Sequence, residues 1–286
     1  MERVDDPRRV LARHGLRAKK SWGQNFLHDR SVHARIVAAA ACTADDVVVE
    51  IGAGLGTLTA ALAAAQPPPA RVIALERDAD MLRVLEAELG AEPRVAITPA
   101  DAAAFDFAGA SRAAGRPIVV VGNLPYQIAS ALVVALVEAR GAIARAVVMV
   151  QREFAQRVVA PPGGRTYGRL SVTVQQHAEA RILFHVPPGA FHPPPAVISS
   201  VMRLVPRGAP LAPVRDEALF AEVVKQAFSM RRKMLRRALE PAFGEAAVAR
   251  ALAAAGIDET LRAERLSVAD FARLADALAI GGGARA

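Results

Sequence analysis

The chain contains a single cysteine, Cys42, and six histidines among its 286 residues. One cysteine can form neither an intrachain disulfide nor a zinc site built from cysteines, so we interpret Cys42 as a small core residue. The histidines are scattered and show no spacing typical of a metal site. We therefore expect no resident metal ion.

Long hydrophobic runs are also missing. No stretch approaches the ~18 uninterrupted apolar residues that a membrane-spanning helix needs. The N-terminal segment is rich in charged side chains and lacks the apolar core of a secretory signal peptide. These absences favour a cytoplasmic protein without a membrane span.

Apolar residues and positive charge, by contrast, are abundant. Hydrophobic residues make up 53% of the chain, enough for one large folded domain and a small one. The formal net charge is +8 and the sequence pI is about 10.6. A positive field attracts polyanions, so nucleic acid is the first partner to expect and an anionic membrane surface the second.

The first two-thirds of the chain alternates between short apolar runs and longer amphipathic stretches. Strands are expected at 47–51, 71–76, 94–98, 117–122 and 146–150, and helices at about 31–41, 57–65, 78–89 and 129–139. This alternation predicts an α/β fold with a parallel, doubly wound sheet and right-handed crossovers.

The pattern changes in the last third of the chain. Two late strands are expected at 182–186 and 197–204, followed by a proline-rich segment, 206–213, that is typical of a linker. Residues 216–280 are predicted to be helical. The predicted domains are therefore residues 1–206 and residues 214–280.

The tetrapeptide Asn123-Leu124-Pro125-Tyr126 follows a predicted strand, at the edge where open α/β sheets bind ligands. An Asn side-chain carbonyl and a backbone carbonyl can accept both hydrogens of an exocyclic amine, and Tyr126 offers a face for stacking. The motif therefore suits a planar base that carries an amine. Taken alone, it is equally consistent with an ordinary strand-to-helix turn.

Gly52, Gly54 and Gly56 separate the first predicted strand from a helix, where glycine lets the backbone approach a ligand closely. Their spacing is one residue short of the dinucleotide fingerprint, and the Lys-Ser or Lys-Thr pair of a triphosphate-binding loop is missing. Glu76 and Asp101 end the next two strands. Either residue alone would more often be a helix cap than a ligand. At successive strand ends, however, their carboxylates could accept from ribose hydroxyls and an adenine amine, which predicts an adenosine-containing cofactor.

Further motifs occur in a fixed order from about residue 19 to residue 278. They are Lys20-Ser21-x-Gly23-Gln24-Asn25-Phe26-Leu27, Glu50-Ile51-Gly52-x-Gly54-x-Gly56, Tyr167-Gly168-Arg169-Leu170-Ser171-Val172, Phe191-x-Pro193-x-Pro195-x-Val197, Phe228-Ser229-x-Arg231-Arg232-Lys233-x-Leu235-Arg236 and Arg262-Ala263-Glu264-x-Leu266-Ser267. With the strand-end residues above, they resemble the KsgA/RsmA family of small-subunit rRNA adenine dimethyltransferases. The resemblance implies a Rossmann-like, S-adenosylmethionine-dependent methyltransferase sheet with a small C-terminal α-helical domain.

The resemblance also implies which residues bind S-adenosylmethionine. An N-terminal segment would close over the cofactor, a glycine loop would line its methionine end, and two strand-end carboxylates would hold its ribose and adenine. The matching residues are Gln24, Asn25, Phe26 and Leu27, then Glu50, Gly52 and Gly54, then Glu76 with Arg77, then Asp101 with Ala102, and finally Asn123, which would contact both cofactor and substrate.

For the substrate, the resemblance implies that Asn123 and the Leu124 carbonyl hold the target N6 amine while Tyr126 and Phe191 sandwich a flipped adenine. The N6 lone pair is delocalised into the ring, and two acceptors would favour a pyramidal nitrogen aimed at the sulfonium methyl. Positioning and electrostatics then suffice without a strong general base. Such a pocket needs a flipped or unpaired base. We hypothesise that the small residue Gly122 leaves the space that a second methyl group requires.

Residues 223–239 carry six basic side chains and no acid, which favours contact with RNA phosphates over an ordinary solvated helix face of mixed charge. The residues are Lys225, Arg231, Arg232, Lys233, Arg236 and Arg237, and most would share neighbouring faces of one helix. Further RNA contacts are expected from Arg165, Tyr167 and Arg169 in a Gly/Pro-rich loop, and from Lys19 and Lys20 at the mouth of the site.

The chain departs from the family pattern at four positions. Ala53 replaces a frequent proline, where only the backbone is needed, and Trp22 replaces a small or aliphatic residue. Ala196 and Ile198 replace a usual Lys and Asp, so the phosphate contact that the resemblance implies for that Lys is not expected here, whereas the stacking role of Phe191 is unaffected.

Three functions compete at this point. The first is dimethylation of two adjacent adenosines in the 3′-terminal hairpin of 16S rRNA, within the 30S subunit or its precursor. The second is the related large-subunit rRNA methylation that confers macrolide resistance, and the third is ribosome assembly with catalysis secondary. The run at Tyr167–Ser171 and the basic segment favour the first. We expect a monomer with no membrane partner.

Overall fold

The computed structural model describes residues 6–19, 23–230 and 232–282 of the chain. The helices are α1 Pro7–Arg13, α2 Arg30–Ala40, α3 Thr57–Ala63, α4 Ala79–Leu89, α5 Phe107–Ala114, α6 Ala129–Glu138, α7 Arg152–Val158, α8 Arg169–His177, α9 Glu217–Ala227, α10 Leu235–Phe243, α11 Glu245–Ala255 and α12 Val268–Gly282. The strands are β1 Phe26–Leu27, β2 Val47–Ile51, β3 Arg71–Glu76, β4 Val95–Pro99, β5 Ile118–Asn123, β6 Ile143–Gln151, β7 Ala178–Val186, β8 Phe191–His192 and β9 Ser199–Pro206. Short 3₁₀ turns include η2 Ala102–Ala104.

The chain divides into two compact units. The sheet unit comprises residues 1–155 and 181–206, and the helical unit comprises residues 156–180 and 207–286. The predicted first domain comprised the whole of 1–206, whereas the structure groups 156–180 with the later helices.

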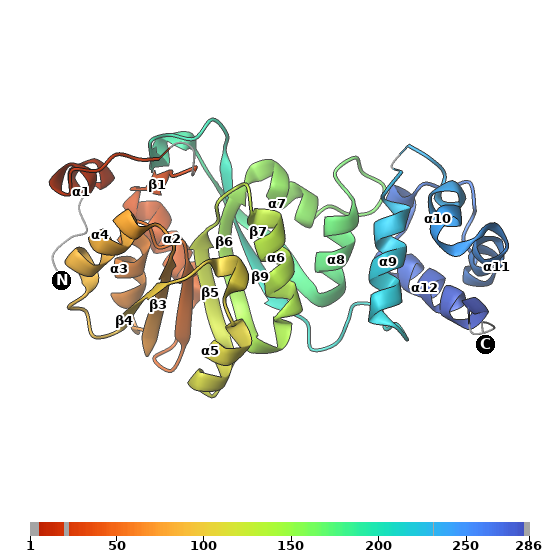
Figure 1. Ribbon diagram of the computed structural model, residues 1–286, viewed down its shortest axis with the longest axis horizontal. Helices are drawn as coiled ribbons and strands as arrows, with labels where there is room; N and C mark the ends of the chain where they lie inside the picture. The colour runs from red at the N-terminus through yellow and green to blue at the C-terminus, as the bar shows by residue number, and fades with distance from the viewer. Residues whose placement is uncertain (1–5, 20–22, 231, 283–286) are drawn as a thin grey trace. The chain divides into compact units, whose positions relative to one another are not determined.

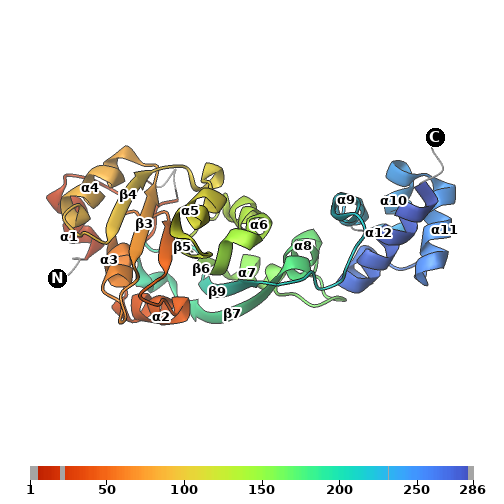
Figure 2. The same ribbon diagram turned by 90° about the horizontal axis from the view of Figure 1, so that it is seen from below.

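The sheet unit is built on a seven-stranded sheet of order β4-β3-β2-β5-β6-β9-β7 (Figure 1). Strands β4, β3, β2, β5 and β6 are parallel, and β9 is antiparallel to β6. Helix α2 lies on one side of the sheet, and α5 and α6 lie on the other (Figure 2). The predicted doubly wound α/β fold is confirmed, and the two late strands are neighbours in the sheet.

The central strands form because their side chains are apolar on both faces. In β5, Ile118 to Val121 are fully buried, as are Val48 and Val49 in β2, which is typical of parallel strands covered on both sides by helices. Cys42 packs partly buried against the core formed by α2, α3 and these strands, as predicted.

Gly122 is required by strand packing. A Cβ placed there would lie 2.7 Å from the carbonyl oxygen of Ile51 on the adjacent strand β2. The space beside Gly122 therefore belongs to the backbone of Ile51, and the hypothesis that it accommodates a second methyl group is wrong.

The strand order creates a topological switch point between β2 and β5. From β2 the chain proceeds outward through β3 and β4 and then returns to β5 on the other side of β2. The carboxyl ends of these four strands lie at one edge of the sheet, where doubly wound folds bind their ligands.

A two-stranded sheet joins the N-terminal segment to a much later part of the chain. Strand β1 pairs antiparallel with β8, with Phe26 opposite His192 and Leu27 opposite Phe191. The His28 N–H extends the ladder by donating to the Ala190 carbonyl at 2.9 Å.

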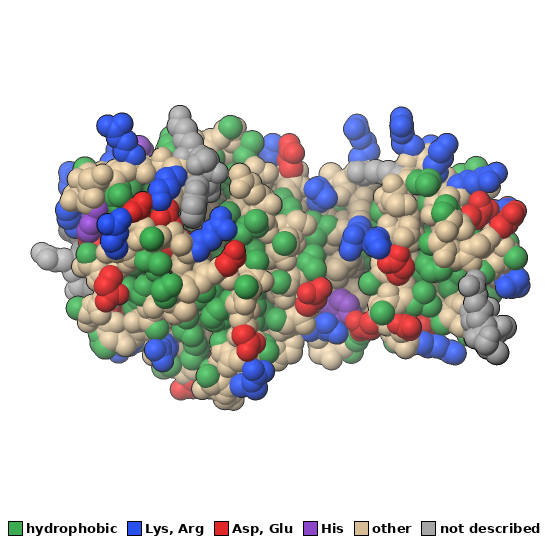
Figure 3. Space-filling view, viewed as in Figure 1, with side chains coloured by type: hydrophobic (Ala, Val, Ile, Leu, Met, Phe, Trp, Pro, Cys, Tyr) green, Lys and Arg blue, Asp and Glu red, His purple; other side chains and the backbone are tan. Residues whose placement is uncertain are grey.

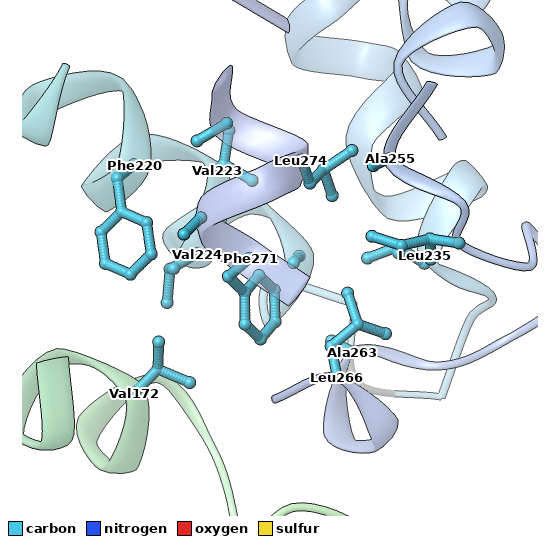
Figure 4. Packing of buried hydrophobic residues seen from close by; sticks show 14 of the residues in the cluster. Val172, Phe220, Val223, Val224, Leu235, Ala255, Ala263, Leu266, Phe271 and Leu274 are labelled. Atoms are coloured by element: carbon cyan, nitrogen blue, oxygen red, sulfur yellow. The ribbon is translucent and has the colours of Figure 1, made fainter. Parts of the chain in front are cut away.

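The helical unit has its own core, which explains why residues 156–180 belong to it. Val172 of α8 packs with Phe220 and Val224 of α9 and Phe271 of α12 (Figure 4). The Tyr167 ring is fully buried and meets Phe228 edge-on at 6.1 Å between centroids. The expectation that Tyr167 contacts RNA from a surface loop is therefore wrong.

The region after the proline-rich segment is helical, as predicted, with no strand among its described residues. No helix in the described part of the chain is both long and apolar enough to span a membrane.

Candidate active site

A cavity lies at the carboxyl ends of the parallel strands in the sheet unit. Every residue predicted to bind the cofactor or hold the base lines it, except Phe191. These lining residues are Gln24, Asn25, Phe26, Leu27, Glu50, Gly52, Gly54, Glu76, Arg77, Asp101, Ala102, Asn123, Leu124, Pro125 and Tyr126. The sequence analysis missed the apolar part of the wall, including Met81 and Ile128, because nothing in their local pattern separates them from core residues.

In the loop after β2, Gly52 and Gly54 line the cavity with backbone atoms alone. Gly52 and Gly54 have φ angles of 72° and 55°, a left-handed conformation that favours glycine. A Cβ on Gly54 would lie 3.2 Å from the Phe26 ring. The Gly52 and Ala53 N–H groups both donate to the Leu75 carbonyl at 3.0 Å, and a proline at position 53 could not make the second bond.

Glu76, at the end of β3, connects the glycine loop to the start of α4. Its Oε2 accepts from the Gly54 N–H at 2.9 Å, and its Oε1 accepts from the N–H groups of Arg77 and Asp78 at 2.8 and 2.9 Å. Three backbone donors hold the carboxylate in one orientation. A carboxylate has lone pairs for additional donors such as ribose hydroxyls.

Glu50 is the most deeply buried carboxyl group of the cavity, with a relative exposure of 2%. Its Oε2 has no hydrogen-bond partner among the described residues. Burial raises the pKa of Glu50 to about 8, and the nearby Glu76 carboxylate acts in the same direction. A cationic group of a ligand would supply the missing partner and favour the ionised form.

Asp101 caps a short turn and also lines the cavity. Its Oδ1 accepts from the Ala103 N–H at 2.9 Å and so caps η2, while Oδ2 lies 3.5 Å from the Arg77 guanidinium. The residue also lines the cavity, so the cap positions a carboxylate there.

The N-terminal segment is anchored to the start of α4. The Gln24 side chain donates to Asp78 at 2.8 Å and accepts from the Lys19 N–H at 2.9 Å. The Lys19 ammonium forms ion pairs with Asp78 at 2.8 Å and Asp80 at 2.7 Å. No local sequence pattern indicated these bonds, because Lys19 and Gln24 lie far from Asp78 along the chain. Lys20 and Trp22 lie outside the described residues.

Asn123 has its amide orientation set by this N-terminal segment. The Asn123 Nδ2 donates to the Asn25 carbonyl at 3.2 Å, so Oδ1 is the atom available to accept from a ligand. The Leu124 N–H donates to the Met149 carbonyl at 2.9 Å, and no group among the described residues donates to the Leu124 carbonyl. Two acceptors therefore stand side by side at the end of β5.

Tyr126 lines the cavity with a partly exposed ring, and its hydroxyl lies 2.8 Å from the Ser199 Oγ. Phe191 is 3% exposed and packs in the core with its partner Leu27. The structure therefore does not bring Phe191 to the cavity, and its stacking role stays a prediction. Ser199 was missed because a buried serine at the start of a strand has no distinctive sequence pattern.

Comparison with known families matches residues 15–279 to "Ribosomal RNA adenine dimethylase". The chain belongs to this family. It is 47% identical to "Ribosomal RNA small subunit methyltransferase A" of Anaeromyxobacter dehalogenans, over 97% of this chain and 99% of the relative.

Solved structures agree with the family assignment. The crystal structure of the 23S rRNA methyltransferase ErmE is 28% identical, with a TM-score of 0.67 over 89% of this chain and 100% of that one. A dimethyladenosine transferase from Plasmodium falciparum shares the fold, with a TM-score of 0.70 at 23% identity over 87% and 95% of the two chains. The chain is thus an rRNA methyltransferase with a Rossmann-like sheet and a C-terminal helical region.

A member of this family needs a surface for RNA, and the structure divides the predicted basic residues into two groups. The expected single helix is wrong, since α9 ends at Ala227 and α10 begins at Leu235. Arg232 and Lys233 lie exposed in the intervening turn, where Lys and Arg side chains gather (Figure 3). Arg231 lies outside the described residues, and Arg169 is exposed at the start of α8.

The other basic residues have carboxylate partners within the helical unit. Arg236 forms ion pairs with Glu240, Glu245 and Glu259 at 2.8, 2.7 and 2.9 Å, and Lys225 pairs with Glu222 at 3.0 Å. The segment 223–239 contains no acidic residue, but Glu222 precedes it directly and Glu240 follows it directly. The composition of the segment therefore gave no indication of these ion pairs.

Proposed function

We propose that the chain transfers methyl groups from S-adenosylmethionine to N6 of two adjacent adenosines in the 3′-terminal hairpin of 16S rRNA, giving N6,N6-dimethyladenosine. The substrate would be the 30S subunit or its precursor. Membership of the dimethylase family and the identity to small-subunit relatives support the substrate class. The observation that carries the chemistry is the pair of acceptors, Asn123 Oδ1 and the Leu124 carbonyl, beside a cavity that a Tyr ring also lines. A monomer in the cytoplasm stays a prediction.

The cavity residues fit S-adenosylmethionine, which supplies an activated methyl group on a sulfonium when bound. The bare glycine loop would admit its methionine end, and the unpartnered Glu50 oxygen would accept from its ammonium group. Glu76 would accept from the ribose hydroxyls, and Asp101 would face the adenine amine. The N-terminal segment, held by Gln24 and Lys19 on Asp78, would cover the cofactor.

The same residues suffice for methyl transfer to an aromatic amine. Asn123 Oδ1 and the Leu124 carbonyl would each accept one N6 hydrogen and turn the nitrogen lone pair toward the methyl group. The alkylated nitrogen is acidic and can lose its proton to water, so no general base is needed. Stacking on Tyr126 would hold the base after it leaves its helix.

RNA would bind in part through the exposed basic residues of the helical unit. Arg232, Lys233 and Arg169 are the exposed side chains we assign to phosphate contact, and Arg231, which lies outside the described residues, keeps the same predicted role. Lys225 and Arg236, which were predicted to do the same, also have carboxylate partners, and we assign Arg236 a role in holding the unit together.

The deciding experiment supplies labelled S-adenosylmethionine with unmethylated 30S subunits and, separately, with naked 23S rRNA. Nucleoside mass spectrometry should detect N6,N6-dimethyladenosine from the 30S subunits alone. The Asn123→Ala variant should lose at least about a hundredfold in rate, because the amine acceptor is removed. It should still bind S-adenosylmethionine in calorimetry, because the Gln24–Asp78 bond holds the N-terminal segment when the Asn123–Asn25 bond is lost. Absence of product from 30S subunits with the wild-type protein would overturn the proposal.

Large-subunit methylation is the second candidate, and the similarity to ErmE is the observation that favours it. Product from 23S rRNA alone would establish that activity. An assembly function can be separated from catalysis with the same variant: Asn123→Ala should bind 30S precursors with wild-type affinity if binding and catalysis are independent.

A further inference from the structure

Ser199 is a buried residue outside the cavity that contacts a residue inside it. It is the first residue of β9, fully buried, and opposite Gln151 of β6 in the sheet. The Arg152 N–H donates to the carbonyl of the preceding residue, Ile198, at 3.0 Å, which fixes where β9 begins. Ser199 Oγ is therefore a rigidly placed hydrogen-bonding atom.

The partner of that atom is the hydroxyl of Tyr126, the only polar group of its ring. Tyr126 lies in the loop between β5 and α6, where the backbone is held at Leu124 and at Ile128. Its hydroxyl lies 2.8 Å from Ser199 Oγ. Burial raises the pKa of the Tyr126 phenol, so this hydroxyl stays neutral and can donate or accept.

We propose that Ser199 is a positioning residue that fixes the place of the Tyr126 ring on which the target adenine stacks. The inference rests on the proposed function. A ring held at its hydroxyl cannot swing away about the Cα–Cβ bond, so a base stacked on it arrives with its amine at a fixed distance from Asn123 Oδ1 and the Leu124 carbonyl. A small displacement of a reacting group lowers the reaction rate by a large factor. The hydrogen bond between Tyr126 and Ser199 should therefore affect the rate of methyl transfer.

The test compares Ser199→Ala, Tyr126→Phe and the double variant in single-turnover methylation of 30S subunits. Each single variant should lower the rate of methyl transfer about five- to tenfold, the loss expected for one hydrogen bond. The double variant should be no slower than the singles, since both remove the same bond. Affinity for S-adenosylmethionine should not change. Ser200→Ala is the matched control, because Ser200 is equally buried and bonds His185 at 2.8 Å, away from the cavity.

Thermal unfolding separates positioning from a merely structural bond. Each single variant leaves one polar group without its partner and should melt at a lower temperature, whereas the double variant removes both groups and should regain stability without regaining rate. Wild-type turnover in Ser199→Ala, or recovered turnover in the double variant, would overturn the inference. If wild-type protein forms no dimethyladenosine on 30S subunits, the proposed function fails and the inference fails with it.

Discussion

At the scale of single residues, the site depends on carboxyl groups whose surroundings differ sharply. Glu76 is held by three backbone donors, whereas Glu50 is buried with one oxygen unpartnered. The first arrangement stabilises a charge, and the second opposes it. The contribution of Glu50 to the free energy of unfolding therefore depends on pH.

We expect Glu50→Gln to stabilise the protein at alkaline pH. The pKa of Glu50, about 8 in the folded protein, lies above its ordinary value of 4.5, so its contribution to stability is fully present below about pH 4.5 and is lost as pH rises toward 8. Glutamine carries no such dependence. Urea unfolding should show little difference between variant and wild type at pH 5 and a variant that is more stable by a few kcal/mol at pH 8.5. Parallel stability curves across this range would contradict the assignment.

At the scale of elements, the sequence predicted the sheet well because its strands are continuous apolar runs and because distinctive residues follow the strand ends. The alternation from β2 to β6 predicted a parallel sheet, and residues at the ends of β2, β3, β4 and β5 converge on the cavity as expected. Pairings between distant segments were not predictable. The Tyr126–Ser199 bond, the Gln24–Asp78 bond and the ion pairs of Arg236 join residues with no shared local pattern.

The turn that contains Arg232 and Lys233 should respond to mutation differently from helix α10, which contains Arg236. Arg232→Ala/Lys233→Ala should weaken binding to 16S rRNA and reduce the slope of log K against log salt by about 1 to 2, while leaving the melting temperature unchanged. Arg236→Ala is the matched control, because it also removes a cation. It leaves three neighbouring carboxylates without the guanidinium that they share, so it should lower the melting temperature. Filter binding over a salt series and thermal scans would distinguish them. Equal salt slopes for wild type and the double variant would remove the turn from the RNA surface.

At the scale of the whole molecule, the helical unit is assembled from two separate parts of the chain. Residues 156–180 leave the sheet unit, bury Tyr167 and Val172 among later helices, and return as β7. The proline-rich sequence after residue 206 predicted a domain boundary there. A boundary at that position would divide this core.

A chain ended after Pro206 should therefore aggregate, because Tyr167 and Val172 lose the apolar partners that cover them. Replacing residues 159–177 by a flexible Gly-Ser linker in the same truncated chain should restore a soluble, monodisperse protein. Soluble yield and size-exclusion profiles of the two truncated chains would show the difference. Equal solubility of both would mean that α8 does not need the C-terminal helices.

The pairing of β1 with β8 has a consequence for the time at which the site forms. Phe26 and Leu27 line the cavity near the start of the chain, yet their strand partners, His192 and Phe191, follow most of the sheet unit in sequence. Closing so long a loop is slow, and during translation it must wait for the second partner to emerge. Nascent chains are therefore expected to complete the parallel strands before they complete this cavity, so the proposed cofactor would bind only late in folding.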